Sequence, residues 1–369
     1  MSSPPGSFTA NLDGASIVVT GGAGFVGSAL AMSLKKANPG AKVVAIDNLR
    51  RAGSELRPAS LKSAGIEFVH GDIRNPDDLT LKGQAVDLLI ECSAEPSVLA
   101  GYGESPRYVI ETNLVGTMNC LELARERKAR VLFLSTSRVY PTALVNELKH
   151  AEDKTRFTLS DTQPITGASA NGISEAFPLE GARTFYGTTK LASEMLLEEY
   201  AAGYGLDYVT LRFGVISGPG QMGKVEQGVF ALWMARHLWG DTLTYKGWGG
   251  TGKQVRDVVH IDDVRDLVLS LVGKWEAGSG KRLNAGGGYS VSASLLEATS
   301  ICQEITGRKL KLGKVTDTHP TDVRIYLTDH AALTKALGWR PKRDVKQIFA
   351  DLYDWMRSDE QRLKPILAG

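Results

Sequence analysis

The most constraining feature of this sequence is the unit formed by residues 16–47. Residues 16–20, Ser-Ile-Val-Val-Thr, form an apolar run typical of a buried strand, and the loop Gly21-Gly-Ala-Gly-Phe-Val-Gly27 follows directly. An apolar helical pattern runs from residue 28 to 36, and a second strand, residues 42–46, ends at Asp47. Glycines stand at 21, 24 and 27, while those at 22, 24 and 27 also fit the pattern G-x-G-x-x-G.

This unit predicts a dinucleotide site. Glycines let the backbone turn tightly and approach a pyrophosphate, and the start of the helix offers free N–H groups to it. Asp47 lies 20 residues after Gly27, where a carboxylate can accept hydrogen bonds from both ribose hydroxyls. That carboxylate repels a 2′-phosphate, so NAD is favoured over NADP, although Arg50 and Arg51 weaken the preference. The predicted cofactor-binding residues here are Gly21, Gly24, Phe25, Val26, Gly27, Asp47 and Asn48.

Strands and helices continue to alternate along the chain. Further apolar runs indicate strands at residues 67–72, 86–92, 131–135 and 208–213, and helical patterns cover residues 106–127 and 186–204. This alternation predicts an α/β fold with a doubly wound parallel sheet. We expect residues 12–215 to form the cofactor-binding domain and residues 216–369 a smaller, interleaved substrate-binding lobe.

Ligands of such sheets bind at the carboxyl ends of the strands, which draws attention to two segments. The end of strand 67–72 is expected to place Asp72 and Ile73 beside an adenine, although Asp72 suits a helix N-cap or turn equally well. Residues 135–140, Ser-Thr-Ser-Arg-Val-Tyr, follow the fifth strand. We expect the Thr136 hydroxyl to reach the ligand cleft, and a β-branched strand residue is the alternative.

Tyr186 and Lys190 stand four residues apart at the start of a predicted helix and therefore share one face. A cation close to a phenol favours the phenolate, which can then take a proton near neutral pH. A lone Tyr-x-x-x-Lys is more often part of an ordinary amphipathic helix. The catalytic interpretation depends on the predicted cofactor site and on Thr136.

Composition excludes several other classes of protein. The 43 basic and 41 acidic residues give a formal charge of +2 without a long basic run, so no nucleic-acid partner is expected. The cysteines, Cys92, Cys120 and Cys302, are far apart and the histidines are scattered, so we predict buried free thiols and no metal site. No apolar run reaches membrane-spanning length, and residues 1–7 lack the features of a secretory signal. We expect a cytoplasmic protein with no membrane partner.

Three segments carry less information. Residues 142–170 are polar and aperiodic, which predicts either a lid over the substrate or a solvated surface excursion. Residues 284–288, Asn-Ala-Gly-Gly-Gly, are interpreted as a loop. The last predicted helix, 344–356, has an apolar stripe that indicates core or interface, formed by Val345, Ile348, Phe349, Leu352 and Trp355.

Together these features resemble the extended short-chain dehydrogenase/reductase family, specifically its NAD-dependent nucleotide-sugar epimerases and dehydratases, over roughly residues 14–356. The resemblance is carried by the loop 21–27, Asp47, Gly71-Asp72, residues 113–117 (Asn-Leu-Val-Gly-Thr), residues 135–140, Tyr186-x-x-x-Lys190, and residues 256–262 (Arg-Asp-Val-Val-His-Ile-Asp). It implies a Rossmann sheet, bound NAD, a nucleotide-diphosphate sugar as substrate, and a homodimer paired through the helices at 106–127 and 186–204.

The resemblance also implies roles for individual residues. Tyr186 is the acid/base, Lys190 holds the nicotinamide ribose and favours the phenolate, and Thr136 bonds to the reacting sugar hydroxyl. Arg256 binds the substrate diphosphate, with an ion pair to Asp257 or Asp262 as the alternative. The remaining implied cofactor-binding residues are Asp72, Ile73, Ser93, Ala94, Asn113 and Ser135, and the implied substrate-binding residues are Glu95, Ser137, Arg138, Gln221, Arg256, Asp322 and Arg324.

Departures from the family pattern narrow the expectation. Ser137 and Arg138 replace the Asp-Glu of the dehydratases, which counts against a 4,6-dehydratase. Glu91 stands where the family often has His, and Val215 replaces an Asn that often contacts phosphate. The late Arg-Pro-Gly-Asp pattern appears as His-Pro-Thr-Asp at 319–322, so Arg324 is the candidate for the missing arginine. Residues 92–98, 135–141, 172–183 and 221–224 are similar to a branch of the family that inverts carbon 2 of CDP-sugars.

We therefore expect an epimerase that oxidises a sugar carbinol with NAD and re-reduces it on the other face. Two alternatives stay open. One is a UDP-sugar 4-epimerase or a nucleotide-sugar dehydrogenase on the same fold. The other is a non-catalytic NAD-sensing regulator, which would have no need of Thr136, Tyr186 and Lys190.

Overall fold

A large parallel sheet organises the protein. The computed structural model describes residues 12–223 and 228–367. Within them, seven strands pair in the order β14-β10-β5-β4-β1-β2-β3, and every pairing is parallel. The strands are β1 (Ser16–Thr20), β2 (Lys42–Asp47), β3 (Glu67–His70), β4 (Leu88–Glu91), β5 (Arg130–Thr136), β10 (Tyr208–Phe213) and β14 (Lys281–Ala285).

Helices cover both faces of this sheet. Ile17 and Val19 of β1 pack with α1 (Phe25–Ala37) and α8 (Ile261–Gly273), whereas Val18 packs with α4 (Gly116–Arg127) and α6 (Phe185–Tyr204). Because both faces are buried, the strands read as continuous apolar runs rather than as alternating ones. The prediction of a doubly wound α/β fold is confirmed. The short helices α2 (Pro58–Ser63) and α3 (Arg107–Ile110) complete this part of the chain.

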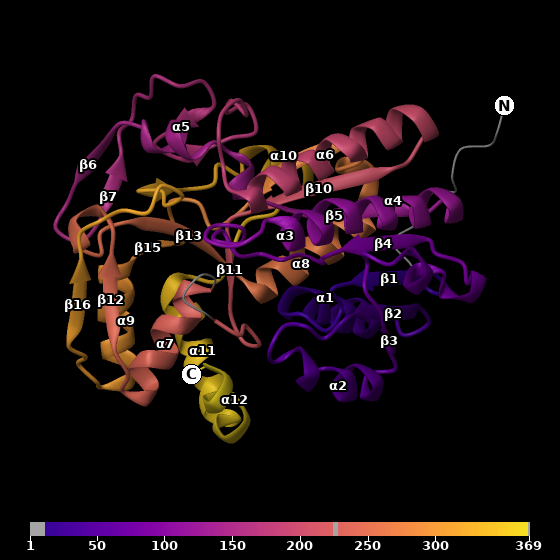
Figure 1. The fold of residues 1–369 in the computed structure, drawn as a ribbon, viewed down its shortest axis with the longest axis horizontal. Coiled ribbons are helices and arrows are strands. Elements are labelled where there is room, and N and C mark those ends of the chain that lie inside the picture. Colours follow the sequence, from indigo (N-terminus) through magenta and orange to yellow (C-terminus); the bar gives the residue numbers. More distant parts are fainter. Residues whose placement is uncertain (1–11, 224–227, 368–369) are drawn as a thin grey trace.

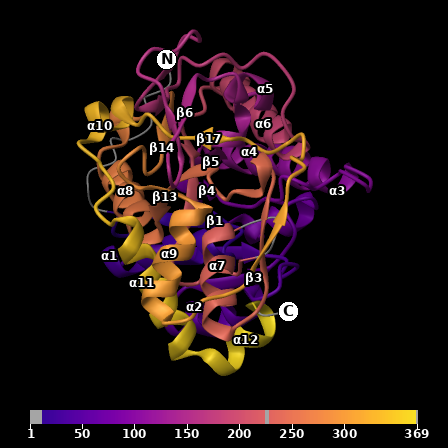
Figure 2. The ribbon, with the colours of Figure 1, turned by 90° about the vertical axis from the view of Figure 1, so that its left-hand side faces the viewer.

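A second group of elements lies to the left of the large sheet in Figure 1. Its four-stranded sheet contains β11 (Val215–Ser217), β13 (Val255–His260), β15 (Ser292–Ser294) and β17 (Ile325–Tyr326), and β12 (Leu243–Lys246) pairs with β16 (Leu312–Val315). The helices α7 (Val229–Trp239), α9 (Leu295–Thr306) and α11 (Val345–Ser358) lie side by side in Figure 2 and share one core. The chain also crosses back, because β14 is the edge strand of the large sheet, and α8 and α10 (Ala331–Leu337) pack on that sheet. The last helix is α12 (Glu360–Leu367).

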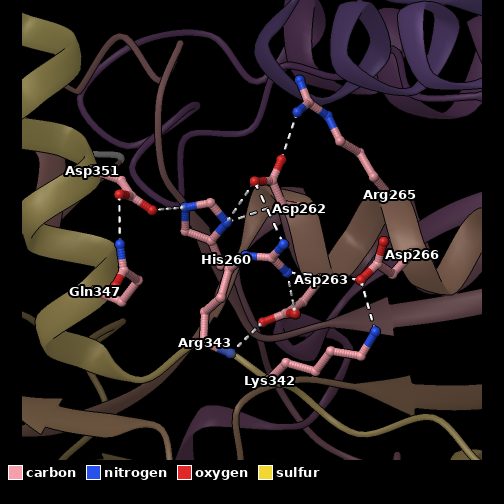
Figure 3. Close-up of polar contacts among 9 residues, drawn as sticks. All are labelled: His260, Asp262, Asp263, Arg265, Asp266, Lys342, Arg343, Gln347 and Asp351. Atoms are coloured by element: carbon pink, nitrogen blue, oxygen red, sulfur yellow. Dashed lines mark hydrogen bonds and ion pairs between the residues drawn. The ribbon is translucent and has the colours of Figure 1, made fainter. Parts of the chain in front are cut away.

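His260 joins the two groups of elements (Figure 3). Its Nδ1 accepts the backbone N–H of Asp262 at 3.0 Å, and its Nε2 lies 3.3 Å from the Asp351 carboxylate on α11. Arg343 bonds to Asp263 at 2.7 Å, so the residues just before α11 are also fixed to the first turn of α8. Burial lowers the pKa of His260, which favours the neutral imidazole at this junction.

The structure corrects several expectations. Asn284 and Ala285 belong to strand β14, so the interpretation of 284–288 as a loop is wrong at its start. The predicted helix 106–127 is interrupted by a π-helical turn, Glu111–Val115, between α3 and α4. Residues 142–170 contain the short elements α5 (Thr142–Asn146), β6 (His150–Glu152), β7 (Phe157–Leu159) and β8 (Ala168–Ser169), which pairs with β9 (Gly172–Ile173).

Ion pairing fixes the segment 142–170 to the second group of elements. Arg156 lies 2.7 Å from Glu297 on α9 and donates to the carbonyl of Ser292 at 2.7 Å. Phe157 packs against Val255 and Leu327, so the base of this segment is part of a core.

Two further expectations concern membrane-spanning helices and the cysteines. No helix of residues 12–223 and 228–367 is long and apolar enough to cross a membrane. The three cysteines are free, as predicted, with Cys120 and Cys302 buried and Cys92 only half-buried. Residues 1–7 and Lys224, which entered the sequence argument, lie outside the described residues.

Candidate active site

The glycine loop after β1 is packed so tightly that side chains are excluded. A Cβ atom on Gly27 would lie 2.1 Å from the carbonyl oxygen of Gly21. A Cβ atom on Gly21, whose φ is +62°, would lie 2.9 Å from the backbone of Cys92 and Ser93. Helix α1 begins within this loop, at Phe25, and no side chain caps its N-terminus. The backbone N–H groups there can therefore hold an anion.

Asp47, at the end of β2, bonds to the backbone of the glycine loop. Its carboxylate accepts the N–H of Ala23 at 3.0 Å and that of Leu49 at 2.8 Å. Burial raises the pKa of Asp47, and these hydrogen bonds oppose the rise. Arg50 lies over the ring of Tyr108 at 4.0 Å, and Arg51 donates to the carbonyl of Met222 at 3.5 Å.

Asn48, Asp72 and Ile73 lie beside Asp47 at the ends of β2 and β3. Asn48 donates to Asp72 at 2.9 Å, and Arg74 pairs with the same carboxylate at 2.6 Å. This pairing holds the pKa of Asp72 well below its usual range. The Ile73 side chain is buried, and its carbonyl accepts a hydrogen bond from Asn119 at 2.8 Å.

Asn113 fixes the loop that follows β4. Its side chain bonds to both backbone groups of Glu95, at 2.7 and 3.1 Å, and donates to Thr189 of α6 at 3.1 Å. The side chain of Glu95 accepts the N–H of Ser97 at 3.1 Å. The loop containing Ser93 and Ala94 is thus held between the glycine loop and α6, while the Asn113 amide is occupied within the chain.

Thr136 and Tyr186 lie on two segments that pack closely. Thr136 is the buried last residue of β5, and its hydroxyl oxygen accepts the N–H of Arg138 at 3.2 Å. Tyr186 is in the first turn of α6, which Thr184 caps at 3.0 Å from the N–H of Gly187. A Cβ atom on Gly187 would lie 2.1 Å from the Arg138 carbonyl, so this glycine permits the close approach.

Lys190, one turn further along α6, contacts a residue to which the sequence argument gave no role. Its Nζ lies 3.3 Å from the Glu91 carboxylate, and the two side chains are only 2% and 1% exposed. Burial raises the pKa of Glu91, while Lys190 opposes the rise. The sequence feature that could have indicated this ion pair is the acidic Glu91 at the end of an otherwise apolar strand.

A second buried network also escaped prediction. Ser135 donates to Glu194 at 2.5 Å, and Glu194 pairs with Arg212 of β10 at 2.5 Å. Arg212 in turn donates to the hydroxyl of Tyr140 at 3.2 Å. Ser135, a predicted cofactor-binding residue, therefore has its hydroxyl hydrogen directed into the core.

Two arginines, Arg138 and Arg256, lie close enough to interact electrostatically, and Arg138 also interacts with Tyr186. Arg256 lies 2.6 Å from Asp322, which is its ion-pair partner in place of Asp257 or Asp262. Arg138, beside the half-buried Ser137, donates to the carbonyl of Thr321 at 3.2 Å. Burial and the nearby Arg256 lower the pKa of Arg138 to about 10. Both guanidinium groups can donate to an anion, while Asp322 and the adjacent Asp257 offset part of their charge.

Arg324 and Gln221, two predicted substrate-binding residues, have partners within the chain. Arg324 approaches His150 at 2.8 Å and lies over the ring of Trp248 at 4.4 Å. Gln221 is buried, and its amide bonds to Ser217 and to the carbonyl of Ile216, both at 2.8 Å. A cavity of about 400 Å³ beside Arg324 is lined by His150, Glu152, Phe157, Trp248, Gly249, Thr318 and Arg324. Among the residues that the structure describes, no cluster of three or more His, Cys, Asp or Glu could hold a metal ion.

Comparison with known proteins identifies the family. Residues 17–286 match the NAD dependent epimerase/dehydratase family. The chain is 29% identical over 349 residues to CDP-paratose 2-epimerase of Salmonella typhi, covering 93% of this chain and 99% of that protein. It is 31% identical over 356 residues to dTDP-glucose 4,6-dehydratase of an Actinoplanes species, covering 93% and 98%.

A solved structure agrees. UDP-glucose 4-epimerase of Thermotoga maritima, crystallised with UDP-glucose, superposes with a TM-score of 0.74 at 26% identity, covering 93% of this chain and 99% of that one. The tight glycine loop, the uncapped start of α1 and the buried Asp47 fit the dinucleotide that this family uses. The chain belongs to the NAD dependent epimerase/dehydratase family, and its cofactor is NAD.

Proposed function

We propose that the protein is a nucleotide-sugar epimerase that inverts carbon 2 of a CDP-sugar. The observation that carries the proposal is the packing of the Thr136 and Tyr186 segments beside the cofactor loop, with Arg138 and Arg256 beyond them. Similarity to CDP-paratose 2-epimerase supports the nucleotide and the carbon. Ser137 and Arg138 replace the acidic pair expected of a dehydratase, which disfavours net elimination of water.

We assign the cofactor roles from the family resemblance and the position of each residue. Gly21, Gly24, Phe25, Val26 and Gly27 form the turn and first helical residues that would hold the pyrophosphate. The Asp47 carboxylate would accept the adenosine ribose hydroxyls, and Asp72 with Ile73 would border the adenine. Ser93 and Ala94 would line the nicotinamide side, and bound NAD supplies a hydride acceptor that becomes a hydride donor.

The chain's own groups would move the proton. Thr136 bonds to the reacting sugar hydroxyl and orients it toward Tyr186. Tyr186, as phenolate, takes the hydroxyl proton while the carbinol hydrogen leaves as hydride, and Lys190 stabilises the phenolate. The keto-sugar then turns within the pocket, and Tyr186 returns its proton after the hydride arrives on the other face. The cycle consumes no net oxidant.

Arginines and one carboxylate would hold the nucleotide. Arg256 and Arg138 supply the donors that suit diphosphate oxygens. Asp322, which bonds to Arg256 and to Trp248 at 3.0 Å, would accept a ribose hydroxyl. The Arg256–Asp322 pair therefore would act as one unit that orients the guanidinium toward the diphosphate.

We also propose a homodimer through α3, α4 and α6. Large apolar side chains are exposed on these elements. They are Ile110 of α3, Val115 of the π-helical turn, Met118 of α4, and Met195 and Tyr204 of α6. Such residues favour a partner helix pair. Light scattering at micromolar concentration should give the mass of two chains, and a monomer would contradict the proposal.

Product analysis tests the function. Purified protein is incubated with NAD and a CDP-sugar or a UDP-sugar, and the products are resolved by NMR. A C2-inverted CDP-sugar is expected. Inversion of a UDP-sugar at carbon 4 would indicate a UDP-sugar 4-epimerase, and stoichiometric NADH would indicate a dehydrogenase. Bound NAD without conversion of either substrate would favour the NAD-sensing regulator.

A further inference from the structure

The ion pair between Glu91 and Lys190 joins the end of β4 to α6. The contact measures 3.3 Å between side chains that are almost entirely buried. Lys190 also lies 4.4 Å from the centre of the Phe133 ring. The second Glu91 oxygen, Oε1, is buried without a hydrogen-bond partner. The main partner of this carboxylate is therefore the lysine of the candidate active site.

Stability alone is a weak reason for such a pair. Removing two charges from water costs several kcal/mol for each ion, and a well-packed apolar pair is often as stable. The carboxylate also leaves one oxygen unsatisfied, which adds a further cost. The preceding strand residues, Leu88 to Ile90, are apolar and buried, and Glu91 is buried to the same extent. The charge at position 91 is therefore explained by its effect on Lys190.

Tyr186 is the group on which that effect would act. It precedes Lys190 by four residues on α6, so the two side chains lie on one face of the helix. The other ionisable or charged groups near this face belong to the elements that pack on α6. They include Arg138 after β5, Cys92 after β4, Arg183 before α6, Cys120 and the Glu122–Arg125 pair of α4, Arg212 of β10 in its pair with Glu194, and the exposed Arg107–Glu111 pair of α3 and the π-helical turn.

We propose that Glu91 is a positioning residue that holds the Lys190 ammonium and partly neutralises the positive charge that Lys190 presents to Tyr186. The inference rests on the proposed use of Tyr186 as the acid/base. Loss of the Glu91 charge would leave the Lys190 ammonium free to act on Tyr186 without compensation. The carboxylate transfers no proton and touches no substrate.

The experiment is a titration of Tyr186 in the NAD-saturated protein. Because the chain has 11 tyrosines, the tyrosinate absorbance of each variant is compared with that of the same variant carrying Tyr186→Phe. The difference gives the midpoint of the Tyr186 titration. Glu91→Gln keeps the shape of the side chain and removes its charge. The Lys190 ammonium would then act on the phenol without compensation, so the midpoint should fall by about one pH unit.

Matched variants separate charge from packing. Glu91→Asp keeps the carboxylate and should leave the midpoint within a few tenths of a unit of the wild type. Glu304→Gln removes an exposed charge on α9 and should leave it unchanged. Glu91→Met is a second charge-removing variant, should Glu91→Gln fail to fold, and should also lower the midpoint.

These titrations test the proposal without requiring the protein to convert a substrate. A midpoint that does not move in folded Glu91→Gln or Glu91→Met overturns it, as does an equal fall in Glu91→Asp. If the expected shift appears but no nucleotide sugar is converted by the wild type, the proposed function fails and the control of Lys190 by Glu91 stands.

Discussion

Arg256 and Asp322 meet at 2.6 Å and join the start of β13 to the segment before β17. The same carboxylate accepts the indole N–H of Trp248 at 3.0 Å, so it is held from two sides. A guanidinium fixed in this way keeps its planar fork in one orientation. We infer that this orientation, and not charge alone, serves the diphosphate.

Arg256→Lys tests that inference because it keeps the charge and removes the fork. We expect the KM for the nucleotide sugar to rise about 10- to 100-fold, the equivalent of one charged hydrogen bond. NAD affinity should not change. Steady-state kinetics and a cofactor titration measure both quantities, and an unaltered KM would show that Arg256 does not contact the substrate.

Gly187→Ala tests the placement of Tyr186. The new methyl group would lie 2.1 Å from the Arg138 carbonyl, so the first turn of α6 must move away from the end of β5. We expect kcat to fall at least tenfold while NAD still binds, because small displacements of reacting groups are costly.

Gly203→Ala on the same helix is the matched control. A Cβ atom there meets nothing within 4 Å, so activity should be kept and the free energy of unfolding should rise by about 0.5–1 kcal/mol. Equal kcat values in the two alanine variants would contradict the account of Gly187.

Asp257→Asn tests a pH effect on stability. Asp257 is fully buried, and burial raises its pKa to about 6. Because the folded state binds this proton more tightly than the unfolded state, the wild type loses stability as pH rises from 3.8 to about 6, and the loss then levels off.

The asparagine variant has no ionisable group at this position, so its stability lacks this dependence on pH. The stability of the wild type relative to the variant should therefore fall by on the order of 3 kcal/mol across that window. Denaturant unfolding at several pH values measures the difference, and a constant difference would show that Asp257 ionises normally.

Asp47→Asn tests the choice of cofactor. The amide keeps one acceptor but loses the charge that disfavours a 2′-phosphate. We expect NAD affinity to fall about tenfold, for one charged hydrogen bond, and the preference for NAD over NADP to narrow. Equilibrium binding of both dinucleotides measures the effect, and an unchanged ratio would remove Asp47 from the adenosine site.

Local features of the fold were predictable from the sequence. The bounds of β1 and β10 follow from apolar runs that end at a glycine loop or a turn, and the periodicity around Tyr186 predicts α6. Strand β14 was missed because it begins with two exposed charges and runs into Gly286–Gly288, which locally resemble a loop.

Long-range pairing was not predictable. Residue types at positions 91, 190, 256 and 322 suggest separate roles, but a sequence does not show which side chains meet after folding. Glu91 and Lys190 are 99 residues apart, and Arg256 and Asp322 are 66 apart. Only the strand order and the turn geometry bring them together.

The central claim is hydride return within one active site, and an isotope experiment tests it most directly. Wild type and Tyr186→Phe are each incubated with NAD and a CDP-sugar in deuterated water, and the product is examined by NMR. We predict C2 inversion without deuterium on carbon by the wild type, and at least a thousandfold less product from Tyr186→Phe, consistent with loss of acid/base catalysis. Deuterium at the inverted carbon, or near-normal turnover by Tyr186→Phe, would contradict the account.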